Sequence, residues 1–223
     1  MKALIVYWHP EPKSFNGAMF RTARESLEVA EHEVKVSDLR EVAFDPVSGR
    51  NNFTTVSNPE YFKQQFEEMH AVEAGGFAPE LESEMGKVEW CDLMIWQFPL
   101  WWFGVPAALK GWVDRVFAMG RFYGGDLGVY ENGACRGKRA MLSLTTGGPE
   151  ESYRQGGFNG DIAGILRPIH RGIFQFTGFE VLAPQVVYGP ARMSDEERIE
   201  HLAAYAARLQ HIDREPPFKV GPY

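Results

Sequence analysis

The chain has 223 residues, of which 44% are hydrophobic and 24% charged. These fractions exclude an intrinsically disordered chain, and the length fits a single domain over residues 1–223. Its 30 acidic and 23 basic residues give a net charge of -7, which argues against a nucleic-acid partner. No segment has the apolar length of a membrane helix or the pattern of a signal peptide, so we expect a cytoplasmic protein that does not insert into membranes.

The two cysteines, Cys91 and Cys135, imply no disulfide framework. No group of His and Cys residues has the spacing of a zinc site, so we expect no bound metal. The thiols of a cytoplasmic protein are expected to stay reduced.

The start of the chain is typical of a β-α-β unit. Residues 3–8 form an apolar run that predicts a buried strand, and a helical period begins near Phe15. In residues 32–39 apolar and polar side chains alternate, which predicts a second strand. The Gly-, Pro- and Asn-containing stretch 40–58 then predicts a long loop.

Strands and helices continue to alternate along the rest of the chain. We expect helices at 59–73, 79–90, 105–119 and 161–176, strands at 92–98, 139–144 and 180–188, and a loop at 120–137. Ser194 and Glu197 form a capping box at the start of a last helix. This order predicts an α/β fold, a parallel sheet with helices on both faces.

Ligands of such sheets bind beyond the carboxyl ends of the strands. Three loops therefore deserve inspection: residues 8–16, 98–105 and 145–161. The first carries His9, Ser14 and Asn16 just before a helix, where free backbone N–H groups suit a phosphate. The alternative is that Ser14 is only a helix cap. Neither the G-x-G-x-x-G fingerprint nor the P-loop motif is present.

The second loop places three consecutive aromatic residues, Trp101, Trp102 and Phe103, at the end of a strand. A surface loop with such a patch binds a flat ligand or meets another subunit, unless the rings form a small local core. The third loop, Thr145-Thr146-Gly147-Gly148, allows close approach of a ligand to the backbone. Together the three loops fit a flavin nucleotide.

At these residues the sequence resembles the NAD(P)H:quinone oxidoreductase (DT-diaphorase) family. The similarity is most specific over residues 97–112, at Asp114-Arg115-Val116-Phe117, and over residues 144–148. It continues at Tyr153, Gly160-Asp161 and residues 178–182. The resemblance implies a flavodoxin-like, doubly wound, five-stranded sheet.

The resemblance also implies the activity. Members hold FAD non-covalently (FMN is the less favoured cofactor) and form homodimers with the active site at the subunit interface. They use NAD(P)H as co-substrate and reduce quinones by ping-pong two-electron hydride transfer. The choice between NADH and NADPH stays open.

Carried over position by position, the resemblance implies three groups of site residues. The flavin phosphates and ribityl chain would contact His9, Ser14, Phe15 and Asn16, with Arg198 near the adenylate end. The ring would lie against Pro99, Leu100, Trp101, Trp102, Phe103, Thr145, Thr146, Gly147 and Gly148. Tyr153 would stabilise the negative charge of the reduced ring.

Asn159 is a departure from the pattern, because mammalian-type members carry a histidine there as the partner of the tyrosine. An amide donates a hydrogen bond but takes up no proton near neutral pH. Tyr153 with Asn159 would therefore form an altered catalytic pair. Trp101 stands where these reductases often have Gln, so we expect a narrower or more apolar pocket.

Two other functions fit part of the pattern. Some relatives are flavin-binding ancillary subunits of glutathione-gated potassium efflux systems. A one-electron carrier of the flavodoxin type is the other alternative, although the Trp-rich loop is larger than a carrier needs.

Overall fold

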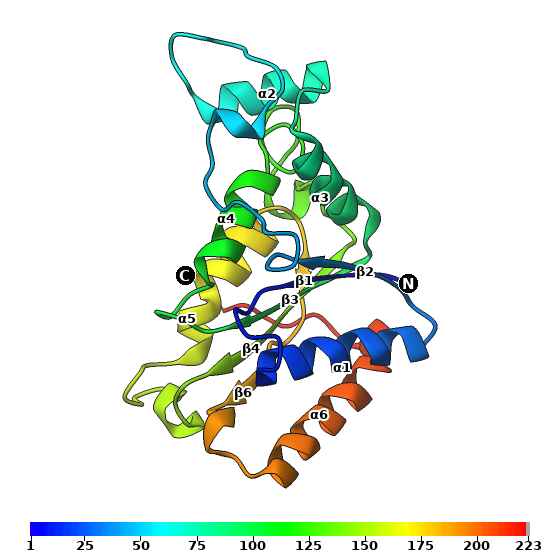
Figure 1. Ribbon diagram of the computed structural model, residues 1–223, viewed down its shortest axis with the longest axis vertical. Coiled ribbons are helices and arrows are strands. Elements are labelled where there is room, and N and C mark those ends of the chain that lie inside the picture. Colours follow the sequence, from blue (N-terminus) through cyan, green and yellow to red (C-terminus); the bar gives the residue numbers. More distant parts are fainter. Residues whose placement is uncertain (222–223) are drawn as a thin grey trace.

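The structure, a computed structural model, describes residues 1–221 and is built on one parallel sheet (Figure 1). The strands are β1 (Lys2–Tyr7), β2 (Glu33–Asp38), β3 (Leu93–Pro99), β4 (Arg139–Thr146), β5 (Glu180–Val181) and β6 (Gln185–Tyr188). Their order is β2-β1-β3-β4-β5, with β6 also paired to β4. This is the flavodoxin-like order, so the predicted fold class is confirmed.

Helices cover both faces of the sheet (Figure 1). They are α1 (Phe15–Val29), α2 (Gln64–Ala74), α3 (Pro79–Trp90), α4 (Ala107–Val116), α5 (Ile162–Ile169) and α6 (Asp195–Leu209). Helices α1 and α6 pack on one face, and α3, α4 and α5 on the other. Helix α2 and the loop before it extend away from the sheet as an arm, coloured cyan in Figure 1.

Strand β1 shows why the sheet is buried on both sides. Leu4 and Val6 belong to the hydrophobic cluster under α3, α4 and α5, while Ala3 and Ile5 belong to the cluster under α1 and α6. Successive side chains of a strand point to opposite faces, so an uninterrupted apolar run serves two cores.

Several expected elements agree with the structure within one or two residues. Helix α3 has the predicted bounds, and α6 begins with the predicted capping box between Ser194 and Glu197. The helix expected at 59–73 starts only at Gln64, so the prediction was wrong for its first turn. The Asn58 side chain accepts from the N–H groups of Glu60 and Tyr61, a local bond that replaces the helical one.

Proline accounts for two further corrections. The helix expected over 161–176 changes at His170 into a π-helical segment, His170–Gln175, after Pro168, which has no N–H to donate. The strand expected over 180–188 is divided into β5 and β6, because Pro184 cannot donate to the ladder. Helix α4 is also shorter than predicted, with Pro106 as its N-cap.

No helix within residues 1–221 combines the length and the apolar character needed to cross a membrane.

Candidate functional site

A cavity of about 840 Å³, here the first cavity, opens at the carboxyl edge of β1, β3 and β4, beside the N-terminal ends of α1 and α6. Its size lies within the usual range for small-molecule sites. The predicted residues that line it are His9, Ser14, Phe15, Asn16, Pro99, Leu100, Trp101, Thr145, Thr146, Gly147 and Arg198. The fold therefore brings the three predicted loops together at one place.

The N-terminus of α1 faces this cavity. Ser14 is the N-cap, and its hydroxyl accepts from the Gly17 N–H at 3.1 Å. Within residues 1–221, the N–H groups of Phe15 and Asn16 have no backbone acceptor. Free N–H groups at the start of a 15-residue helix suit an anionic ligand such as a phosphate.

A buried chain of amide groups ties α1 to the sheet. Gln97 Nε2 donates to Asn16 Oδ1 at 2.8 Å, and Asn16 Nδ2 donates to Thr145 Oγ1 at 2.7 Å. These two bonds hold the Asn16 side chain in place, and its backbone N–H has no backbone acceptor and can donate to a ligand. Because Thr145 Oγ1 accepts from Asn16, its own proton remains available to the cavity.

The aromatic loop contains a strained turn. Trp101 and Gly104 exchange both backbone hydrogen bonds, at 3.1 and 2.9 Å, and Trp102 and Phe103 between them have φ angles of 52° and 56°. Such a turn normally carries Asn-Gly, and left-handed bulky residues cost about 1–3 kcal/mol each. Strain of this kind is characteristic of ligand sites.

The turn continues from the cavity wall formed by Leu100 and Trp101. Trp102 and Phe103 do not line the first cavity, and the Trp102 side chain is 99% exposed. Their N–H groups have no backbone acceptor in the described part of the chain. The turn thus presents two donors and two aromatic rings outward.

Gly148, Tyr153 and Asn159 form a separate group just past the Gly147 end of the cavity. A Cβ at Gly148 would lie 3.3 Å from Tyr153 Cε2 and 3.4 Å from Asn159 Nδ2. Tyr153 is buried, with its ring 5.8 Å from that of Tyr188. The predicted catalytic pair is therefore adjacent in space, although neither member lines the cavity.

His9 also lines the cavity, and its loop holds the ring in place. Its Nδ1 lies 2.9 Å from the Glu11 carbonyl oxygen and 3.0 Å from the Glu11 nitrogen. The ring centroid of Trp101 is 6.4 Å from His9 and 5.3 Å from Trp8. With Nδ1 engaged by the loop, Nε2 is the atom of His9 that could meet a ligand.

The cavity also has lining residues that the sequence analysis missed. They are Lys13 and Ala18 from the α1 side, and Gly189, Pro190, Ala191, Asp195, Ile199 and Leu202 from the α6 side. Arg198 donates to the carbonyls of Pro190 and Met193 and pairs with Asp195, so it shapes this wall. The Gly189-Pro190 break before the capping box was the available signal.

Two phenols near the site stay neutral. Burial raises the pKa of Tyr7, which stacks on Phe20 at 4.4 Å, and burial also raises the pKa of Tyr188. No group of three His, Cys, Asp or Glu residues suited to a metal occurs among residues 1–221. Besides the hydrogen-bond donors described above, the cavity is lined by the charged residues Lys13, Asp195 and Arg198.

Comparison with known proteins shows which family the chain resembles along its whole length. Residues 1–211 match a family described by its flavodoxin-like fold. A ribosyldihydronicotinamide dehydrogenase [quinone] from Rattus norvegicus is 44% identical, over 99% of this chain and 96% of the relative. NAD(P)H dehydrogenase [quinone] 1 from Cavia porcellus is 43% identical, over 99% of this chain and 80% of the relative.

A solved structure is similar to this chain over nearly its full length. A candidate quinone reductase from Klebsiella pneumoniae superposes with a TM-score of 0.93 at 38% identity, over 97% of this chain and 86% of the other. Fold, strand order and full-length similarity all lead to one assignment. The chain belongs to the NAD(P)H:quinone oxidoreductase family, a group of oxidoreductase enzymes with a flavodoxin-like fold.

Proposed function

We propose that this enzyme binds FAD in the first cavity and catalyses two-electron reduction of a quinone or similar flat acceptor by a reduced nicotinamide in a ping-pong reaction. The observation that supports it most is the convergence on this cavity of backbone N–H groups without a backbone acceptor at the start of α1, next to the wall of Leu100 and Trp101 from which the aromatic turn continues. When bound, a flavin supplies the hydride chemistry.

The donor set fits a flavin nucleotide. The N-terminus of α1 would bind the phosphates, and the Thr145 hydroxyl with the Gly147 backbone would bind the polar edge of the ring system. Gly147 has no heavy atom within 4 Å of the position of a Cβ, so a ligand can approach its backbone closely. The N–H groups of Trp102 and Phe103 are further donors for the same ring.

The shape of the first cavity favours FAD over FMN. Beyond the phosphate loop it continues along Pro190, Ala191, Ile199 and Leu202, a mostly apolar wall at the start of α6. FMN ends at its phosphate and would leave this part empty, whereas the adenosine of FAD would fill it.

The resemblance implies a homodimer, and exposed apolar side chains support one. Trp102, Phe103 and Phe158 are exposed near the mouth of the site, and Tyr61 and Phe66 are exposed on the arm. Large apolar side chains in such numbers normally meet a partner. We infer that a second copy covers them and completes the active site at the interface.

The protein's own groups would act at defined points. Tyr153, held beside Gly148 and Asn159, would stabilise negative charge on the reduced ring by hydrogen bonding. Asn159 would donate a hydrogen bond and move no proton. The rings of Trp102 and Phe103 would form an apolar floor for a flat acceptor and exclude water from it.

A steady-state assay with menadione as acceptor tests the proposal. The relatives named above suggest three donors to compare: NADH, NADPH and dihydronicotinamide riboside. We expect menadione-dependent oxidation of at least one donor by FAD-loaded protein, and a lower rate with FMN. If no donor is oxidised although FAD is retained, the ancillary-subunit alternative becomes the better account.

A further inference from the structure

The carbonyl groups of the loop after β4 are hydrogen-bonded within the protein. The carbonyl oxygens of Thr145 and Thr146 accept from backbone N–H groups at 2.8 and 3.0 Å, and that of Gly148 accepts from the Thr146 hydroxyl at 2.8 Å. The Gly147 oxygen accepts from Nη1 of Arg192, also at 2.8 Å. Each carbonyl of this loop therefore already has a donor.

The N–H groups at the end of the same loop are free. Within residues 1–221, neither Gly147 nor Gly148 donates its N–H to a protein acceptor. Gly147 lines the first cavity, and Gly148 lies beside Tyr153 and Asn159. A loop whose carbonyls are engaged and whose N–H groups are free presents donors to a ligand, so it favours a ligand edge that carries negative charge.

Arg192 is the charged group among the donors to this loop. It lies in the short segment Pro190–Arg192 between β6 and α6 (Figure 1) and is exposed. No carboxylate pairs with it among the residues that the structure describes, and Asp195 at the start of α6 pairs with Arg198 instead. Arg192 is therefore a cation whose charge the protein does not neutralise.

A single peptide unit links Arg192 to the ligand side of the loop. The Gly147 carbonyl and the Gly148 N–H belong to the same planar trans peptide, so they point in opposite directions. A guanidinium that donates to the carbonyl fixes the orientation of this peptide and polarises it, which makes the N–H at the other end a stronger donor. Because Arg192 does not itself line the first cavity, its effect reaches a ligand through this peptide.

We propose that Arg192 is a positioning residue that holds the Gly147–Gly148 peptide as a donor to the FAD ring and makes the protein bind reduced FAD more tightly relative to oxidised FAD. The reduced ring carries more negative charge, so it gains more from a polarised donor. Because FAD binding belongs to the proposed function, this inference rests on it. Arg192 thereby raises the flavin potential and limits which acceptors the reduced enzyme can reduce.

Equilibrium reduction of the FAD-loaded protein against a dye of known potential measures this preference. Arg192→Gln removes the charge and keeps a neutral donor, so the ratio of reduced to oxidised FAD affinity should fall roughly threefold to tenfold. A tenfold fall lowers the midpoint potential by about 30 mV for a two-electron couple. Arg192→Lys keeps a charged donor and should stay within about twofold of the unaltered ratio. Arg24→Gln, a matched loss of an exposed charge on α1, should leave the potential unaltered.

Fluorescence titration with oxidised FAD separates this role from a purely structural one. A structural loss weakens oxidised and reduced FAD alike, so an unchanged potential in Arg192→Gln would overturn the proposal even if FAD affinity falls. The same lowered potential in Arg192→Lys as in Arg192→Gln would also overturn it, because the charge would not be the cause. Protein that takes up no FAD would instead refute the proposed function. FAD-loaded protein that reduces menadione, with an unchanged potential in Arg192→Gln, would refute this inference alone.

Discussion

At the scale of single residues, the adjacent glycines Gly147 and Gly148 of the loop after β4 have different roles. Gly147 has open space where a Cβ would stand, while a Cβ at Gly148 would press on Tyr153 and Asn159. Gly147 is therefore dispensable for folding, and its absence of a side chain matters for what approaches from the cavity. Gly148 instead allows the Tyr153 and Asn159 side chains to lie against the loop.

Gly147→Ala should leave the free energy of unfolding within about 0.5 kcal/mol of the unaltered protein, because the added methyl meets no protein atom. FAD affinity should nevertheless fall roughly tenfold or more, since the methyl occupies space that the ligand needs. Denaturant unfolding and FAD titration measure the two effects. Unchanged FAD affinity would show that the ring does not lie against this loop.

Asn159→His should introduce a pH dependence into the rate of flavin reduction. Histidine titrates near neutral pH and lies beside Tyr153 in this loop, whereas an amide does not titrate. Stopped-flow reduction from about pH 6 to about pH 8 should show an inflection only in the variant. Superimposable profiles for the two proteins would refute a role for this position in the proton balance.

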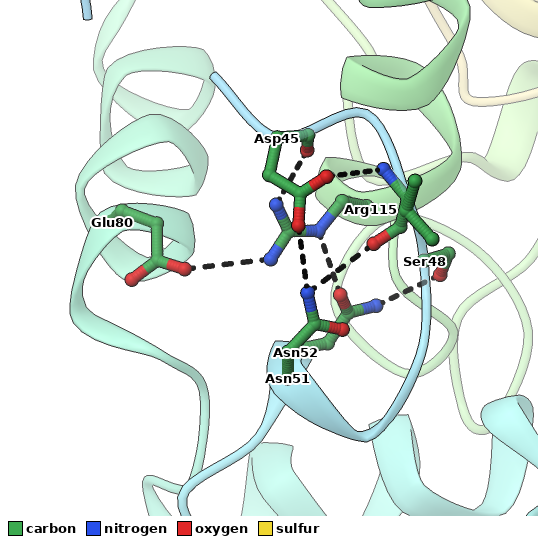
Figure 2. A network of polar contacts seen from close by, with 7 residues as sticks. Asp45, Ser48, Asn51, Asn52, Glu80 and Arg115 are labelled. Carbon is green, nitrogen blue, oxygen red and sulfur yellow. Dashed lines mark hydrogen bonds and ion pairs between the residues drawn. The ribbon is translucent and has the colours of Figure 1, made fainter. Parts of the chain in front are cut away.

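At the scale of elements, the loop before the arm depends on one side chain of α4. Arg115 joins Asn52 Oδ1 and the Asp45 carbonyl, at 2.7 and 2.6 Å, and its contact with Glu80 reaches α3 (Figure 2). The guanidinium geometry serves three partners at once. Lysine cannot reproduce that arrangement.

Arg115→Lys should lower the free energy of unfolding by about 2–4 kcal/mol, because buried acceptors lose their donors. The loop over residues 44–53 should also become more sensitive to limited proteolysis. Arg24→Lys, on an exposed i,i+4 pair of α1, is the matched control and should change stability by less than about 0.5 kcal/mol. Equal stability of the two variants would contradict this role of Arg115.

Local signals predicted most of these elements. Pro79 at a helix start and the Ser194–Glu197 capping box act within one turn, and both predictions were confirmed. The first turn expected at 59–63 failed partly because Glu67, ten residues away in sequence from Ser57, accepts from the N–H groups of Ser57 and Asn58. The periodicity of apolar residues does not predict a hydrogen bond between residues ten positions apart.

The candidate site could be predicted from the sequence only in part. Residues just after β1, β3 and β4 could be placed at one sheet edge from topology alone. The wall from Pro190 to Leu202 could not, because it depends on how α6 packs against α1.

At the scale of the whole molecule, burial of one histidine links stability to pH. His170, 2% exposed between Phe174 and Phe218, has its pKa lowered to about 4 by desolvation. The unfolded chain binds this proton near pH 6.5, so the unfolded state is favoured as pH falls from about 6.5 to about 4. The free energy of unfolding should fall by roughly 3 kcal/mol over this pH range because of His170.

His170→Phe should therefore flatten the decline of the unfolding free energy over that pH range, because the substituted ring has no proton to bind. Urea unfolding at several pH values measures this dependence of the unfolding free energy on pH. His211→Gln, a change at an exposed histidine, should leave the slope as it is in the unaltered protein. A slope that survives His170→Phe would assign the pH dependence to other groups.

The central claim concerns the whole molecule, a flavin enzyme that passes two electrons from a nicotinamide donor to a quinone. Its most direct test is anaerobic mixing of FAD-loaded protein with NADH, NADPH or dihydronicotinamide riboside, followed by menadione, with flavin absorbance recorded near 450 nm, roughly the flavin maximum. The account predicts rapid bleaching by at least one donor and full recovery on quinone addition. Retained FAD that no donor bleaches would contradict it.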